Sequence, residues 1–157
     1  MGEVKEGYLN KKDMDYLNKV VVSNDMFPWY VLPKPVNEKY PCMSHVLLPR
    51  YDYKNNEGFK INSDLYGPML DIINNICQKH KIKIKRILRA QFNLTWKFKG
   101  VYSTPHFDHD FKHKNVIIYC NKFTKGSTYL FKETYRDKKP KTIMKEMKAD
   151  KGKYFIF

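Results

Sequence analysis

Three histidines and two aspartates fall within eight positions of the stretch Tyr102-Ser103-Thr104-Pro105-His106-Phe107-Asp108-His109-Asp110-Phe111-Lys112-His113. Pro105 has a restricted φ and biases its predecessor toward an extended backbone, so we expect a loop to become a strand there. On a strand, His106 and Asp108 would point to the same face, with Cα atoms roughly 6.5 Å apart. On a helix they would diverge by about 200°. The pattern therefore predicts a strand over 106–108 whose two side chains reach one metal ion.

Two further strands are predicted downstream of this stretch. The run Val116–Asn121 is rich in β-branched and aromatic residues, which is typical of a buried strand. Residues 122–125 have the composition of a turn, and Gly126–Phe131 begins the next strand. The order is therefore His-x-Asp, an apolar strand ending in Tyr-x-Asn, and Gly-x-Thr-x-x-Phe.

This order resembles the iron(II)- and 2-oxoglutarate-dependent oxygenases, in particular the prolyl-hydroxylase-like branch and its small phage- and virus-encoded members. The resemblance covers roughly residues 26–157 and is specific over 102–131. It implies a double-stranded β-helix (a jelly roll, cupin-like). It also implies Fe(II), 2-oxoglutarate and O2 as cofactors, with ascorbate as a further candidate. The implied reaction hydroxylates a C–H bond of a prolyl or other protein side chain, or of a small molecule, with succinate and CO2 as co-products.

The resemblance also implies roles for individual residues. His106 and Asp108 correspond to the first two metal ligands. Tyr119 corresponds to the residue whose hydroxyl reaches the distal carboxylate of 2-oxoglutarate, and Thr128 to a residue that lines the cosubstrate pocket. His113 and Asn121 are interpreted as residues that support the site. A solvent-exposed role is expected for His109 and Asp110.

A third histidine ligand and an arginine for the distal carboxylate would be expected after the apolar strand Tyr154–Phe157. No histidine follows His113 in the sequence, and Arg136 is the only arginine beyond Arg89. We therefore expect the last strands of the jelly roll to be missing, which leaves an incomplete barrel and little turnover. Either the sequence is a truncated member or the protein has lost the third ligand.

Two other functions fit parts of the sequence. One is a catalytically inactive relative that acts as a basic binding module for nucleic acid or an acidic protein. The other is a metal hydrolase that uses His106 and Asp108 together with Asp110 or His113. The oxygenase interpretation is preferred to the hydrolase because the downstream strands follow the order of the oxygenases.

The net charge of +14 bears on whether the protein binds nucleic acid or another acidic partner. A strong positive charge is typical of nucleic-acid or acidic-membrane binding. However, only four of the 30 cationic residues are arginines, and arginine is favoured where phosphates and bases are recognised specifically. We therefore expect the lysines to be spread over the surface. The opposite expectation is one continuous patch formed by Lys81, Lys83, Lys85, Arg86 and Arg89.

The remaining composition predicts a single domain in a reducing compartment. The three cysteines, Cys42, Cys77 and Cys120, lack the spacing of a metal site, so reduced thiols in the cytoplasm of a bacterial or other host cell are expected. No apolar run is long enough for a membrane span. The predicted fold is mainly β (α+β), with a helical and edge-strand part over 1–80 and the jelly-roll core over 81–157.

Several local elements are predicted from periodicity. A short helix is capped by Asp13, and a longer one over 63–80 is capped by Ser63. Strands are expected over 27–33, at an edge because of its prolines, and over 44–48, where His45 is a structural or surface residue. Residues 81–95 are predicted to form one long strand or two consecutive strands. Residues 142–148 are predicted to form a strand or a helical turn. Residues 51–60 are predicted to form a mobile loop, which is a candidate lid.

Overall fold

The computed structural model describes residues 3–32, 42–50, 60–96, 105–122, 124, 126–133 and 142–157. The chain forms two compact units, Met1–Phe27 with Ser103–Phe157, and Pro28–Tyr102. The fold is mixed α+β, and every described strand pair is antiparallel. No helix in these ranges is long and apolar enough to cross a membrane.

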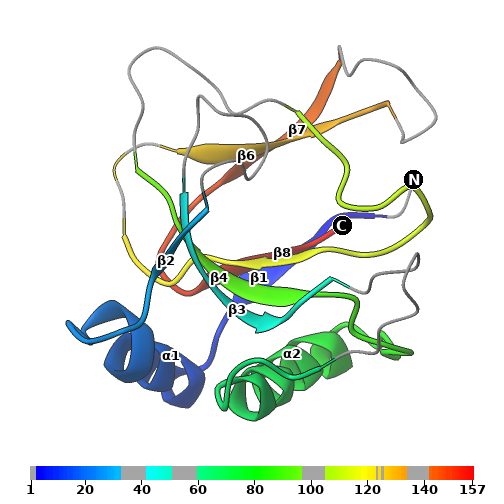
Figure 1. The fold of residues 1–157 in the computed structure, drawn as a ribbon. Coiled ribbons are helices and arrows are strands. Elements are labelled where there is room, and N and C mark those ends of the chain that lie inside the picture. The colour runs from blue at the N-terminus through cyan, green and yellow to red at the C-terminus, as the bar shows by residue number, and fades with distance from the viewer. Residues whose placement is uncertain are drawn as a thin grey trace. The chain divides into compact units, whose positions relative to one another are not determined.

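The main sheet of the first unit joins the beginning and the end of the sequence. Its strand order is β1 (Lys5–Tyr8), β8 (Lys153–Ile156), β5 (Val116–Ile118), and Figure 1 shows β1 beside β8. The three apolar residues Tyr154, Phe155 and Ile156 are almost completely buried, which confirms the predicted C-terminal strand. Because β1 pairs with β8, residues 5–8 share a sheet with the C-terminal strand.

A second, two-stranded sheet in this unit is formed by β6 (Ser127–Phe131) and β7 (Ile143–Lys148). Both had been predicted as strands, β7 with a helical turn as the alternative. Met147 is completely buried, although its neighbours in β7 are largely exposed. In the sequence this pair lies between β5 and β8, so an inner pair of strands is nested within an outer pair.

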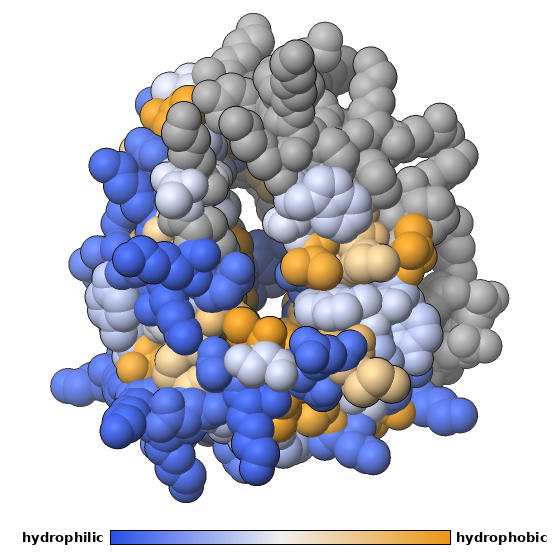
Figure 2. Space-filling view, turned by 90° about the vertical axis from the view of Figure 1, so that its left-hand side faces the viewer, coloured by the Kyte–Doolittle hydropathy of each residue, from blue (hydrophilic) through white to orange (hydrophobic). Residues whose placement is uncertain are grey.

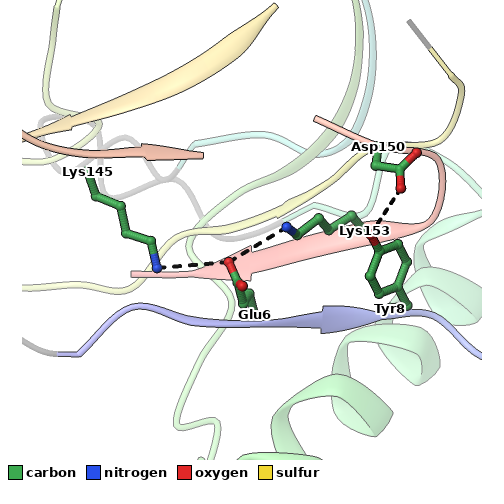
Figure 3. Close-up of polar contacts among 5 residues, drawn as sticks. All are labelled: Glu6, Tyr8, Lys145, Asp150 and Lys153. Atoms are coloured by element: carbon green, nitrogen blue, oxygen red, sulfur yellow. Dashed lines mark hydrogen bonds and ion pairs between the residues drawn. The ribbon is translucent and has the colours of Figure 1, made fainter. Parts of the chain in front are cut away.

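A glutamate connects the two sheets at the surface. Glu6 of β1 forms ion pairs with Lys145 of β7 and Lys153 of β8 (Figure 3). Its Oε2 atom lies 3.9 Å from the Lys145 Nζ atom and 3.8 Å from the Lys153 Nζ atom. Nearby, the Tyr8 hydroxyl donates to the Asp150 carboxylate at 2.9 Å, and this contact is the main reason that the pKa of Tyr8 is raised. These polar contacts are solvent-exposed, so each contributes little to stability.

The N-terminal helix α1 (Lys11–Leu17) continues into a π-helical turn, η1 (Asn18–Val22). Its apolar residues Leu17 and Val21 are buried, as the spacing predicted. The predicted cap was wrong: Asn10 caps the helix by accepting from the Asp13 backbone N–H at 2.8 Å. The Asp13 carboxylate accepts in return from the side-chain amide of Asn10 at 2.9 Å. The two side chains therefore form a reciprocal cap, with Asn10 at the N-cap position and Asp13 in the first turn.

The second unit contains a three-stranded sheet in the order β2 (Tyr30–Leu32), β3 (Cys42–Leu48), β4 (Ala90–Leu94). β2 is an edge strand, as its flanking prolines predicted. Of residues 81–95 only β4 is a strand. Its ladder with β3 ends at the pair Leu48 and Ala90 after a bulge, so residues 82–89 stay irregular.

Helix α2 (Tyr66–Lys79) confirms the longer predicted helix but begins three residues later than its predicted cap. Ser63 stands before the helix, where its hydroxyl accepts from the Leu65 N–H at 3.3 Å. The buried side of α2 carries Met69, Ile72, Ile76 and Cys77. This helical spacing agrees with the predicted apolar stripe. Of the predicted lid, residues 51–59 lie outside the described part of the chain.

Candidate functional site

The predicted metal ligands His106 and Asp108 lie close together but not on a strand. The His106 Nε2 and Asp108 Oδ1 atoms are 3.9 Å apart, and the two side chains are 49% and 36% exposed. The predicted strand over 106–108 was wrong, because residues 105–115 are irregular. The ladder between β5 and β8 reaches only to Asn115, which exchanges two backbone hydrogen bonds with Phe157. Beyond that pair no described strand holds the stretch extended.

The alternate residues of the same stretch form an aromatic cluster. The ring centroid of His109 lies 4.9 Å from those of both Phe111 and His113. The His113 Nδ1 atom lies 2.7 Å from the Phe111 carbonyl oxygen, and since a carbonyl only accepts, this nitrogen is the donor. His113 therefore fixes the irregular backbone locally, and its predicted role in supporting the site stays a prediction. Asp110 is exposed.

The two residues expected at the cosubstrate pocket contact one another. The Tyr119 hydroxyl and the Thr128 Oγ1 atom are 2.7 Å apart. Tyr119 directly follows β5, where its N–H donates to the Lys153 carbonyl and its own carbonyl accepts from Gly152. Thr128 lies in β6, so this hydrogen bond connects the two sheets of the first unit.

The environment keeps the Tyr119 phenol protonated. Burial raises the pKa of Tyr119, and the hydrogen bond with Thr128 opposes this shift only partly. At neutral pH the side chain is therefore a neutral O–H donor, which is the form that can bind a carboxylate. Burial likewise raises the pKa of the neighbouring Cys120 thiol to about 11, so without a bound metal this side chain is a neutral thiol near neutral pH. Asn121 is exposed.

A third metal ligand is not found near His106 and Asp108 within the part of the chain that the structure describes. No group of three or more histidine, cysteine, aspartate or glutamate side chains in those ranges is arranged to hold a metal ion. Arg136, the only arginine beyond Arg89, lies outside the described residues. The expectation that the third ligand is missing stays a prediction.

The basic row after α2 is solvent-exposed. Lys81, Lys83, Lys85 and Arg86 are exposed, and the isoleucines between them are half-buried. Arg89 differs from these residues because it is half-buried. Burial raises the pKa of the Cys42 thiol, and the positive charge of Arg89 opposes part of this shift. Figure 2 shows that hydrophilic side chains dominate much of one face of the molecule. Whether the lysines as a whole are evenly spread stays a prediction.

His45, predicted as a structural or surface residue, is buried, and the sequence did not indicate its hydrogen-bond partners. This side chain is only 8% exposed. Its Nδ1 atom lies 2.9 Å from the Pro28 carbonyl oxygen, and its Nε2 atom lies 2.8 Å from the Ser63 hydroxyl. The three residues come from separate parts of the sequence, and no spacing rule connects them. The only signal was a histidine within a largely apolar strand.

Comparison of the chain with protein-family models, with curated proteins and with solved structures gives no significant match.

Proposed function

We propose that the chain is an iron(II)- and 2-oxoglutarate-dependent oxygenase of the prolyl-hydroxylase-like type, built on a jelly roll, that hydroxylates a substrate C–H bond. The observation that carries the proposal is the 2.7 Å contact between Tyr119 and Thr128. The resemblance assigned both residues to one cosubstrate pocket, although they are nine positions apart and belong to different sheets.

The strand pairing supports the fold part of this proposal. A jelly roll is a long hairpin folded over, so that its inner and outer strand pairs lie in different sheets. In the first unit the inner pair β6–β7 and the outer pair β5–β8 belong to different sheets. This nesting is what the middle of a jelly roll requires.

The donors His106 and Asp108 suit Fe(II), which is commonly held by histidine and carboxylate ligands on one face. Two adjacent ligands with bonds of roughly 2.1 Å would have donor atoms about 3 Å apart. At 3.9 Å, the Nε2 and Oδ1 atoms need to approach by only about 1 Å, and both side chains are exposed enough to rotate. These two residues would hold the ion. With only two protein donors, we expect weak metal binding and slow turnover.

The phenol of Tyr119 would bind and orient the cosubstrate. Because it is kept protonated, it can donate a hydrogen bond to a 2-oxoglutarate carboxylate, and Thr128 holds it in place. Bound iron with 2-oxoglutarate would supply the oxidising chemistry for hydroxylation. The protein side chains contribute binding and orientation.

Metal binding tests the proposal independently of turnover. Titration with Mn(II), a redox-stable substitute for Fe(II), should show one site that weakens at least about tenfold in His106→Ala and in Asp108→Ala. Asp110→Ala is the matched control from the same stretch and should bind normally. Loss of binding in Asp110→Ala instead would favour the metal-hydrolase interpretation, and unchanged binding in the first two variants would contradict the proposed ligands.

Succinate release tests the cosubstrate side. With Fe(II), 2-oxoglutarate and O2 the chain should release succinate slowly, and His106→Ala should abolish the release. Tyr119→Phe removes one charge-assisted hydrogen bond, so the Kd for 2-oxoglutarate should rise about tenfold while the Mn(II) affinity is unchanged. An unchanged Kd in Tyr119→Phe would remove the observation on which the proposal rests.

The exposed basic row favours one second candidate, the binding module for nucleic acid. In that case, replacing Lys81, Lys83 and Lys85 by glutamine should weaken RNA or DNA binding and reduce its dependence on salt. Replacing the exposed Lys11, Lys12 and Lys122 is the charge-matched control. Equal loss in both triple variants would indicate a general effect of net charge.

A further inference from the structure

The proton positions at His45 follow from its partners. The Pro28 carbonyl can only accept, so the Nδ1 atom of His45 carries a proton and donates it. In the neutral imidazole the Nε2 atom is then an acceptor, and the Ser63 hydroxyl, 2.8 Å away, donates to it. A hydroxyl hydrogen-bonded to an imidazole that a third group orients is the arrangement of an activated serine nucleophile.

The segment that carries Ser63 is fixed to the strand that carries His45. The preceding residue, Asn62, donates its backbone N–H to the Leu47 carbonyl at 2.9 Å and its side-chain amide to the Val46 carbonyl at 2.8 Å. On the other side, Leu65 donates to the Ser63 hydroxyl itself. β3 is the central strand of its sheet. The base therefore lies on a sheet strand, and the irregular segment that carries the nucleophile is hydrogen-bonded to that strand.

We propose that Ser63 and His45 form a hydrolytic site for carboxylic esters, oriented by the Pro28 carbonyl. The Ser63 oxygen attacks the acyl carbon while its proton passes to His45 Nε2. The bond between the acyl carbon and the alcohol oxygen breaks, and the alcohol leaves with that proton. Water then attacks the acyl-serine, giving a proton to His45, and the carboxylic acid leaves as the proton returns to Ser63.

The surroundings indicate esters rather than amides. The Pro28 carbonyl is neutral, so it stabilises the imidazolium less than the carboxylate of a complete triad would. A weaker base of this kind suits an alcohol leaving group. α2 begins three residues after Ser63, and its N-terminal partial positive charge favours the negative oxygen that develops on the acyl group. The exposed Tyr30 ring lies 6.2 Å from the His45 ring and offers an aromatic surface to a short aliphatic or aromatic acyl group.

A fluorophosphonate probe, which reacts covalently with activated serines, tests the site. Peptide mapping of the labelled full chain should find the probe on Ser63, and Ser63→Ala should lose both the label and the hydrolysis of p-nitrophenyl acetate. His45→Gln should react at least about 100-fold more slowly, because it removes the general base. Ser127→Ala is the matched control, since that hydroxyl donates to the Glu146 carboxylate instead of an imidazole, and it should react normally.

Absence of label on Ser63 in the folded parent chain, with a known serine hydrolase labelled in parallel, would overturn the proposal. Equal hydrolysis by the parent and Ser63→Ala would overturn it as well. Circular dichroism melting of each variant verifies that it is folded, and Ser63→Ala, which leaves His45 in place, provides the decision if His45→Gln does not fold. The assays contain EDTA, so their outcome is independent of metal binding at His106 and Asp108.

Discussion

The stretch 105–115 and the surroundings of His45 represent two opposite ways of placing reactive side chains. The first gathers three histidines and two aspartates within eight residues, yet it is irregular, and its leading pair is exposed. The second brings together Pro28, His45 and Ser63 from separate parts of the sequence, and its histidine is buried with both ring nitrogens hydrogen-bonded.

The difference shows that residues close together in sequence are not necessarily held in a fixed arrangement by the fold. Neighbours such as His106 and Asp108 are only two residues apart, and in the irregular backbone of 105–115 their side chains come within 3.9 Å. His45 and Ser63 are close only because a strand and the segment before a helix are fixed together by Asn62. The first pair is exposed on irregular backbone, whereas the second is buried and hydrogen-bonded on both sides.

The largest expected effect tests whether the sheet next to the stretch is the stable part of the first unit. Phe155 in β8 is 1% exposed, and Phe155→Ala should lower the free energy of unfolding by about 3–5 kcal/mol. Phe107 in the irregular stretch is 42% exposed, and Phe107→Ala should change it by about 0.5 kcal/mol or less. Urea titrations of both variants measure the contrast, and equal losses would mean that the stretch is packed as firmly as the sheet.

An intermediate effect compares the two histidine sites directly. His45→Ala leaves a cavity and removes the imidazole partner of two part-buried groups, the Pro28 carbonyl and the Ser63 hydroxyl, so the free energy of unfolding should fall by about 1–3 kcal/mol. In the absence of metal, the free energy of unfolding of His106→Ala should lie within about 0.5 kcal/mol of that of the parent. The same urea titrations decide this, and a large loss in His106→Ala would show that the exposed stretch is preorganised after all.

The smallest effect tests whether burial, rather than polar contact as such, makes the difference. Glu6 has two ion-pair partners but is 47% exposed, so Glu6→Gln should cost less than about 1 kcal/mol, and less still at high salt. Glu3→Gln is the control, because Glu3 is 83% exposed and its ion-pair partner among the described residues is Lys5, two positions along the chain. A loss in Glu6→Gln as large as that in His45→Ala would contradict the role given to burial.

Much of the local structure was predictable from the sequence. The sequence correctly indicated α2, the edge strand β2 and the strands β6 and β8, and it left β7 open between a strand and a helical turn. The predicted strand over 106–108 was wrong. Alternation describes what a strand would look like, but a strand exists only where a partner continues the ladder, and that ladder reaches only to Asn115.

The sequence by itself determined helix α2, the edge strand β2 and the apolar strand β8, because these follow from the spacing of apolar residues and prolines along the chain. The tertiary structure alone decided that β1 pairs with β8, that Tyr119 meets Thr128 across two sheets, and that His45 meets Ser63. Such contacts depend on which strands pair with one another and on which distant segments of the chain the fold brings together. The free energy that selects them comes from burying the core as a whole, which no single stretch of sequence encodes.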